Sequence, residues 1–422
     1  MTSEVALLNK SCIALAADSA STVTFWENSQ PKVRYFKGAN KIFNLSSAHP
    51  VGLMTYASAD LQGVPWEIIV KAYRQHLKQK AHDALLGYAE DFFDFIATNG
   101  HLFPAATEEQ QFKRLADQTA TKIVHLIRRD QALKTAVDDS ERRKLFETVL
   151  AKRAAQIGDA SFVPGADQND ANSATARFAR NIQRMLEIDA WYDDVPRHSM
   201  SELAKAAILG VYKKDFTGLQ ETGLAFSGFG DKEYLPRMAV YRCSGFVLGK
   251  FLYLKEKEIR IDHENVSDLV PLAISEMIGT FVWGIGEQGL GLIADSFRKQ
   301  ADALIRDIRA AGHLPTALDV APFIEAASID QLDELLDHLE ESHRTPLKRV
   351  ISNLPFSEMA ELAESLVFME SMKERVTTFT ESVGGPIDVA LISKSDGFIW
   401  IKRKHYFDPK LNPRFFDRHD KT

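Results

Sequence analysis

Short runs of hydrophobic and β-branched residues, many alternating with polar ones, fill most of the first 60 positions. A period of two is typical of strands that bury one face, so this pattern predicts β-structure. The predicted strands cover residues 5–8, 13–17, 33–36, 41–45 and 51–57. From Asp60 onward, apolar residues recur at helical spacing, with Pro65 near the first turn of the predicted helix.

Helical spacing continues from about residue 80 to 214, with breaks near 159–173 and 193–196 where Gly, Pro, Asp and Asn gather. Strand patterns return at residues 224–229, 238–243, 251–254 and 281–284. Further helices are predicted at residues 289–311, 329–343 and 355–378. The order of predicted elements is therefore sheet, helices, sheet, helices.

The composition narrows the class of protein. The chain has 422 residues, of which 45% are hydrophobic and 26% charged, as in ordinary globular proteins. A net charge of −7 with mixed signs gives no case for a nucleic-acid partner. Two cysteines, Cys12 and Cys243, cannot form a disulfide framework. Because the chain also has neither a secretory signal nor an apolar run of the ~20 residues that cross a bilayer, we expect a cytoplasmic protein without a membrane partner.

Two patterns that could hold a cofactor or a metal have simpler interpretations. Residues 284–289 match the glycine pattern of dinucleotide-binding turns, but that site needs a parallel βαβ unit, and we interpret them as a strand-to-helix turn. His338 and His343 are five residues apart, whereas two zinc ligands on one helical face need a spacing of four. We therefore expect no cofactor and no metal.

The first residues could supply a nucleophile. Removal of Met1 would leave Thr2 with a free amine and a hydroxyl on one residue, and the amine could act as base for the hydroxyl. Asp18 ends the second predicted strand, which returns beside the first. Taken alone, Met-Thr is an ordinary start, and an Asp at a strand end is an ordinary turn residue.

The segment from Thr2 to Asp18 resembles, without a gap, the start of proteasome β subunits. These are the threonine-protease branch of the N-terminal nucleophile (Ntn) hydrolases. Residues 383–392 (Val-Gly-Gly-Pro-Ile-Asp-Val-Ala-Leu-Ile) and 394–399 (Lys-Ser-Asp-Gly-Phe-Ile) are similar to the closing hairpin of the same subunits. The resemblance implies an α/β (α+β) fold: a four-layer αββα sandwich in which two antiparallel sheets lie between helical layers.

The resemblance also implies how the chain is divided. It covers residues 2–76 and 357–402 well and 200–300 loosely. We therefore expect a sandwich core formed by residues 2–82, 199–308 and 356–402, a helical insertion at 83–198, a second helical insertion at 309–355, and a C-terminal tail at 403–422.

The resemblance implies the roles of several site residues. Thr2 is the nucleophile, and Asp18 orients a lysine that precedes an apolar strand. Lys41 fits that position, with Lys37 and Lys32 as rivals because the intervening loop is longer than usual. The resembled stretch Ala-Gly-Gly-x-Ala-Asp corresponds to residues 55–60. Tyr56 therefore stands where a glycine N–H stabilises the oxyanion, and its bulk could narrow the cleft.

Two positions depart from the pattern of the family. Ile285 replaces the serine of a Gly-Ser-Gly segment. An Asp-x-x-Ser segment before the final Gly-Gly corresponds to residues 380–383, where neither the Asp nor the Ser matches. Ser382 or Glu381 fits this segment after a slip of one residue, so Ser382 is a further catalytic candidate.

The sequence thus favours a threonine peptidase or amidase that acts on a peptide or protein. The resemblance also implies a homo-oligomer, and it leaves any ATPase or unfoldase partner unidentified. A catalytically inactive scaffold that acts through its helical insertion is the alternative. Thr2, Asp18 and Lys41 favour the enzyme, whereas Tyr56, Ile285 and Val383 favour the scaffold.

Overall fold

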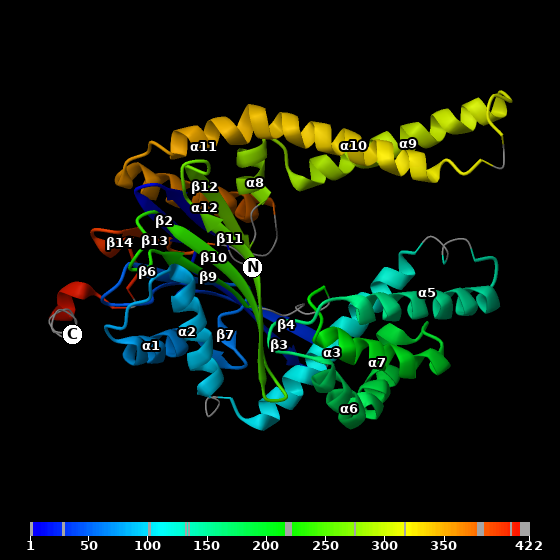
Figure 1. The fold of residues 1–422 in the computed structure, drawn as a ribbon, viewed down its shortest axis with the longest axis horizontal. Helices are drawn as coiled ribbons and strands as arrows, with labels where there is room; N and C mark the ends of the chain where they lie inside the picture. Colours follow the sequence, from blue (N-terminus) through cyan, green and yellow to red (C-terminus); the bar gives the residue numbers. More distant parts are fainter. Residues whose placement is uncertain are drawn as a thin grey trace.

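The computed structural model describes residues 3–27, 30–99, 103–130, 133, 136–215, 222–273, 276–315, 318–377, 384–405 and 407–413. Two five-stranded antiparallel sheets form its centre (Figure 1). The first sheet has the order β12 (Ser267–Ala273), β1 (Ser3–Asn9), β2 (Cys12–Ala17), β13 (Asp388–Ser393) and β14 (Gly397–Lys402). The second has the order β11 (Lys250–Arg260), β10 (Arg237–Val247), β9 (Thr222–Gly228), β6 (Val51–Tyr56) and β5 (Ile42–Asn44).

Side chains alternate between the two faces of the first sheet. On β1, Val5 and Leu7 join a core with the helices that cover this sheet, while Ala6 and Leu8 join the core between the two sheets. Both faces are therefore buried, which explains why every residue of β1 and β2 is buried.

Helices cover both outer faces of the pair of sheets. The helices α8 (Glu276–Trp283), α11 (Thr345–Ile351) and α12 (Phe356–Thr377) share a core with the first sheet. The helices α1 (Trp66–Leu77) and α2 (Leu85–Thr98) share a core with the second. The predicted four-layer sandwich of antiparallel sheets between helices is confirmed.

Two helical regions extend from the sandwich on the same side (Figure 1). The first, here called the helical unit, consists of α3 (Ala105–Arg128), α5 (Asp139–Asp159), α6 (Gln168–Ile188) and α7 (Met200–Val211), which share one core. The second, here called the arm, is the antiparallel pair α9 (Glu287–Ala310) and α10 (Ala321–Leu339). Helix α2 shares a core with the second sheet and so belongs to the sandwich, whereas α7 shares the core of the helical unit.

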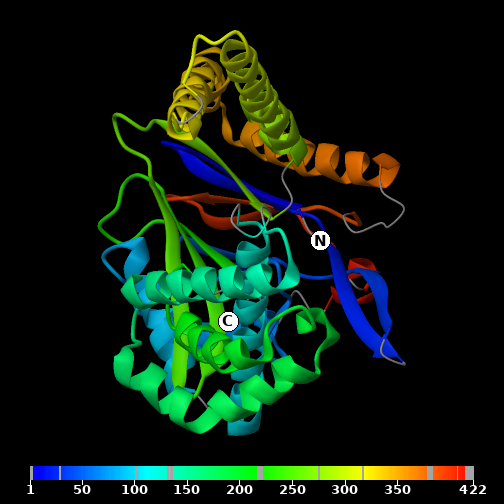
Figure 2. The ribbon, with the colours of Figure 1, turned by 90° about the vertical axis from the view of Figure 1, so that its right-hand side faces the viewer.

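The remaining elements are short or peripheral. A separate hairpin, visible at the side of the molecule in Figure 2, is formed by β3 (Ala20–Glu27) and β4 (Gln30–Lys37). The others are β7 (Asp60–Leu61), β8 (Val64–Pro65), η2 (Ala190–Tyr192), η3 (Arg197–Ser199), η4 (Glu340–Arg344) and η5 (Pro409–Leu411). None of the helices in the described ranges is both long enough and apolar enough to span a bilayer.

The strand predicted at residues 281–284 is wrong, because these residues lie at the end of helix α8 and in the turn to α9. The buried carboxylate of Glu370, on α12, accepts hydrogen bonds from the N–H groups of Met277 (2.8 Å) and Ile278 (3.3 Å) in the first turn of α8. This cap comes from almost 100 residues away, so a local pattern cannot reveal it. Residues 284–286 therefore connect two helices, residues 287–289 begin α9, and no strand precedes them.

Candidate active site

The candidate site lies where β1 begins and β2 ends. Ser3 and Asp18 face each other there: the Asp18 N–H donates to the Ser3 carbonyl at 3.1 Å, and the Ser3 N–H donates to Asp18 Oδ1 at 3.1 Å. The β1–β2 pairing in the register Glu4 to Ala17 sets this contact. Thr2, the predicted nucleophile, lies outside the described residues, so Ser3 is the part of the N-terminal strand that the structure places at Asp18.

Asp18 joins segments from distant parts of the sequence. Its Oδ1 also accepts a hydrogen bond from the Lys41 ammonium, and its Oδ2 accepts from the N–H groups of Ala20 (3.3 Å) and Gly384 (2.7 Å). Four donors thus satisfy a carboxylate that is almost fully buried. A carboxylate held this way is fixed in orientation, as a residue that positions a neighbouring cation must be.

The Gly-Gly pair before β13 makes the contact with Gly384 possible. Gly384 has φ of 140° and Gly385 has φ of 85°, values that glycine adopts without steric cost. A Cβ on Gly385 would also lie 3.1 Å from the Cβ of Lys37. The neighbouring Ser19 hydroxyl donates to the Pro386 carbonyl, so two adjacent residues after β2 hold this turn in place.

Lys41 is buried, with only 5% of its surface exposed, immediately before β5. Besides Asp18, its Nζ lies 3.2 Å from Oε1 of Glu4. Lys32 and Lys37, the two rival lysines, lie on β4, where both are exposed. Of the three lysines, Lys41 is therefore the one that the structure brings to Asp18.

Glu4 was not among the residues predicted for the site. It is fully buried on the face of β1 that points between the sheets. In the sequence Ser3-Glu4-Val5, a charged residue inside an otherwise apolar strand was a signal, because a buried carboxylate requires a partner. Glu4, Asp18 and Lys41 together hold two acidic groups and one basic group. This excess of formal negative charge would attract a second cation.

Tyr56 ends β6, and its backbone N–H points toward β9. The Phe229 N–H donates to the Pro50 carbonyl at 3.1 Å, so Pro50 and Phe229 form a hydrogen-bonded pair. Such pairs recur at every second residue of an antiparallel ladder. Tyr56 therefore forms the same kind of pair with Gly223, and its N–H is directed there. On the opposite edge of β6, the Thr55 N–H donates to the Lys41 carbonyl at 2.9 Å. The next N–H on the side of Lys41 therefore belongs to Ala57.

The Tyr56 ring occupies space between the sheets. It covers Gly223, where a Cβ would lie only 1.9 Å from the ring, and it packs against the core between the sheets. Burial raises the pKa of its hydroxyl above the ordinary value, and the negative charges of Glu256 and Glu4 add to this shift. The tyrosine hydroxyl therefore stays protonated at neutral pH and does not serve as a base.

Ala57 has a φ of 67°, which is unusual for a residue with a side chain. It stands where the resembled Ala-Gly-Gly-x-Ala-Asp stretch has its second glycine, and that match was a signal for this backbone conformation. Ser382, the other predicted catalytic residue, lies outside the described residues, as do Glu381 and Val383. Ile285 lies in the turn between α8 and α9.

The sequence matches no known family model and no curated protein. Among solved structures, it aligns over 100% of its length with 96% of an Anbu mutant from Hyphomicrobium sp. strain MC1, at 11% identity and a TM-score of 0.25. At a TM-score this low the alignment does not establish a common fold. The fold of this chain is defined by the layers and strand order described above.

Across the described ranges, no group of three or more His, Cys, Asp or Glu side chains is placed to hold a metal ion. The chemistry that the described site offers is electrostatic. A fixed carboxylate, a buried ammonium and a second carboxylate surround the start of the N-terminal strand.

Proposed function

We propose that the protein is a threonine peptidase or amidohydrolase of the Ntn type, in which Thr2 attacks an amide after Met1 is removed. The observation that carries the proposal is the buried contact of Asp18 with the Ser3 N–H, the Lys41 ammonium and the Gly384 N–H. Burying a carboxylate and an ammonium together is costly in free energy, and such a pair at the start of the first strand is suited to a reactive chain end.

In the proposed reaction, the Thr2 hydroxyl oxygen attacks the carbonyl carbon of the amide and its proton passes to the Thr2 amine. The C–N bond then breaks, the leaving amine takes that proton, and an ester on Thr2 remains. Water hydrolyses the ester and releases the acid. The Lys41 ammonium favours the neutral, basic form of the amine, and the Ala57 N–H is the oxyanion donor that we favour over Tyr56.

Covalent labelling tests the nucleophile directly. We expect a peptide epoxyketone or β-lactone to modify the N-terminal peptide that begins at Thr2, as read by mass spectrometry. Thr2→Ala should abolish labelling while circular dichroism stays unchanged, and Thr2→Ser should retain part of it because the hydroxyl and the amine persist. Equal labelling of the wild type and Thr2→Ala would rule the assignment out.

The charges around Lys41 give a second test. Lys41→Ala should lower turnover by ~10²-fold or more, because it removes the cation that favours the neutral amine. Lys37→Ala and Lys32→Ala are matched controls that should change it little, since both lysines lie exposed on β4. A comparable loss in Lys37→Ala, together with full activity of Lys41→Ala, would contradict the assignment.

Glu4 should act in the opposite direction. A nearby carboxylate favours the protonated amine, so it raises the pH above which the amine is a free base. Glu4→Gln should therefore move the acidic limb of the pH–rate profile to lower pH by about one unit. A limb that stays in place would show that Glu4 serves only to balance the charge of Lys41.

The second candidate is an inactive scaffold with the same sandwich. The Tyr56 ring over Gly223 favours it, because this ring occupies space between the sheets at the end of β6. A scaffold would show no labelling and no hydrolysis, and Tyr56→Gly would not create either. Labelling of Tyr56→Gly but not of the wild type would instead show that Thr2 is a competent nucleophile and that the Tyr56 ring excludes the probe.

A further inference from the structure

The arm formed by α9 and α10 belongs to none of the hydrophobic cores that the described residues form. Within those residues, no residue of α9 is buried, and in α10 only Ser328 is. This is unusual for two helices of 24 and 19 residues, because most helical stability in proteins comes from burying an apolar face.

The two helices cover each other only in part. Partly buried apolar residues follow α9 at spacings of three and four, as in a two-helix seam. They are Leu290, Ala294, Phe297, Ala301, Ile305 and Ile308. Other apolar residues remain exposed: Leu292 (71%), Ile293 (40%), Leu304 (61%), Phe323 (69%) and Ile329 (51%). The arm therefore has more apolar surface than two helices can bury.

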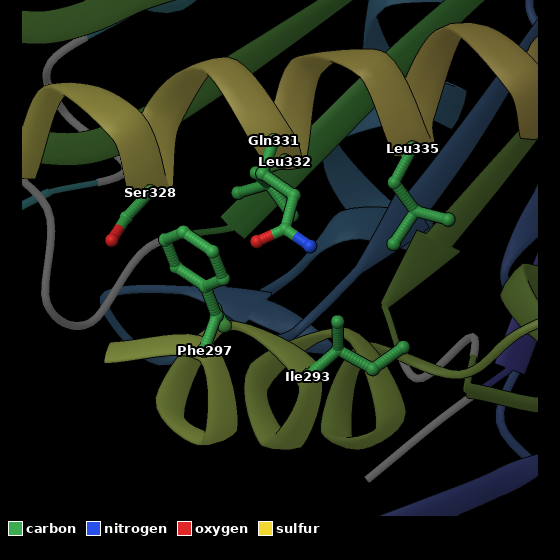
Figure 3. Close-up of a pocket in the computed structure, with 7 residues that line it drawn as sticks. Ile293, Phe297, Ser328, Gln331, Leu332 and Leu335 are labelled. Atoms are coloured by element: carbon green, nitrogen blue, oxygen red, sulfur yellow. The ribbon is translucent and has the colours of Figure 1, made fainter. Parts of the chain in front are cut away.

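A hollow opens along one side of the seam. It has a volume of about 150 Å³ and is lined by Ile293, Ala294, Phe297, Ser328, Gln331, Leu332 and Leu335. Figure 3 shows Ile293 and Phe297 projecting from α9 toward Leu332 and Leu335 of α10. The hollow is large enough for one aliphatic side chain and is almost entirely apolar.

The same face of α9 carries a side chain that fits the hollow. Ile293 and Leu304 are eleven residues apart, which is about three helical turns, so both lie on one face at a separation of about 16 Å. A two-fold axis midway between them would place Leu304 of one copy opposite Ile293 of the other. A surface with a hollow and a knob related in this way is self-complementary, as a two-fold interface requires.

Charged residues flank the apolar seam. On α10 the charged residues are all acidic: Glu325, Asp330, Asp333, Glu334 and Asp337. On α9 four basic residues (Arg298, Lys299, Arg306 and Arg309) accompany four acidic ones (Glu287, Asp295, Asp302 and Asp307). The arm therefore carries a net negative charge, and burial of its apolar surface must supply the stability of an association between two copies.

We propose that the arm is a dimerisation element: two copies of this chain pair their α9–α10 hairpins into a four-helix bundle, with Leu304 of each copy in the hollow of the other. A four-helix bundle is the smallest common arrangement in which such hairpins enclose a core. The arm contains no residue of the candidate active site, so pairing of two arms is independent of the proposed function.

Sedimentation velocity of the full chain tests the proposal. At tens of micromolar, we expect the wild type to form dimers or even-numbered assemblies. Leu304→Glu should weaken the association at least tenfold, because a carboxylate would have to enter the apolar hollow. Leu292→Glu is the matched control, because Leu292 is more exposed but points away from the face that holds Ile293 and Leu304. It should associate as the wild type does.

Cysteine pairing tests the geometry. After mixing and mild oxidation, chains with Ile293→Cys and chains with Leu304→Cys should form a disulfide with each other, whereas Leu292→Cys should pair with neither. The native cysteines, Cys12 and Cys243, are buried and should not interfere. A wild-type chain that stays monomeric, or a Leu304→Glu assembly of unchanged mass, would overturn the proposal and leave a different protein as the occupant of the hollow.

Discussion

The helical unit and the arm extend from the same sandwich, yet they bury apolar side chains very differently. The unit of α3, α5, α6 and α7 encloses a core of its own, which also takes Val247 and Leu252 from the tips of β10 and β11. The arm of α9 and α10 encloses none. Both sequences have the spacing of amphipathic helices. Helical periodicity therefore predicts the helix but not whether the chain itself supplies what covers its apolar face.

Polar contacts show the same contrast. In the helical unit, the Gln111 side chain donates to the Ser244 carbonyl at 2.6 Å, and both residues are buried. The Lys213 ammonium donates to the carbonyls of Gly158 (2.9 Å) and Ala160 (2.7 Å). In the arm, the ion pair between Arg298 and Glu325 at 3.2 Å joins two exposed side chains. Buried polar contacts of the first kind lock a structure in one arrangement, and exposed ones do so weakly.

The largest expected effect is on packing. Phe112 is fully buried, with ring centroids 5.0 Å from Phe178 and 6.5 Å from Tyr212. Phe112→Ala should lower the free energy of unfolding by about 3–5 kcal/mol, because it leaves a cavity. Phe297→Ala in the arm, measured in the Leu304→Glu background, should cost less than about 1 kcal/mol. Equal losses in urea unfolding would show that the arm has a core after all.

The next effect concerns the buried lysine of the helical unit. Lys213→Met keeps most of the side-chain volume but leaves the Gly158 and Ala160 carbonyls without their donor. We expect a loss of about 1–3 kcal/mol in thermal unfolding. Lys299→Met, the same change at an exposed position of α9, should stay within about 0.5 kcal/mol of the wild type. The comparison fails if the two substitutions cost the same.

A smaller effect is expected at a helix start. Asp167 caps α6, since its side chain accepts from the N–H groups of Asn169 (2.8 Å) and Asp170 (3.0 Å) and its own N–H donates to Asp170 (3.0 Å). Asp167→Ala should cost about 1 kcal/mol, and Asp167→Asn much less, because asparagine also caps helices. No change in unfolding for Asp167→Ala would indicate that the start of α6 is not part of the cooperative unit.

The smallest effect is expected within the arm. Arg298→Ala removes the exposed ion pair with Glu325 and should change the stability of the arm by less than about 0.5 kcal/mol. Its effect should also shrink as salt is added. Hydrogen exchange of the α9 amides provides the measurement. A larger loss that persists in high salt would mean that the arm is held by specific polar contacts and not by its apolar seam.

Much of the sandwich could be predicted because its strands follow local rules. The segments that became β1, β2, β5 and β6 show apolar and β-branched patterns. The arrangement of two sheets with helices outside was what the family resemblance implied. Strand β12 was not predicted, since Asp268 and Pro271 interrupt its pattern, and residues 281–284 were assigned to the wrong class because Glu370 caps α8 from a distance. Pairing partners and caps that lie far along the chain leave no local trace.

The candidate site, like the sandwich, could be predicted only in part from the sequence. Asp18 and Lys41 could be placed from a resemblance in order and spacing, and the structure brings them into contact. Glu4 was missed, because only the position of Lys41 shows that its carboxylate has a partner. The change from Tyr56 to Ala57 as the favoured oxyanion donor depends on which edge of β6 each N–H faces, and the sequence alone does not give this register.

The hydrogen bond from Gly384 to Asp18 has a consequence for the timing of biosynthesis. Asp18 is made among the first residues, but its last donor lies 366 positions later, and β2 has no second neighbour until β13 has been made. At about 5–20 residues per second, the ribosome needs roughly 20–80 s to reach that point. During this interval the nascent N-terminus lacks its complete set of donors. The nucleophile that we propose would therefore meet its complete site only when nearly all of the protein has been made.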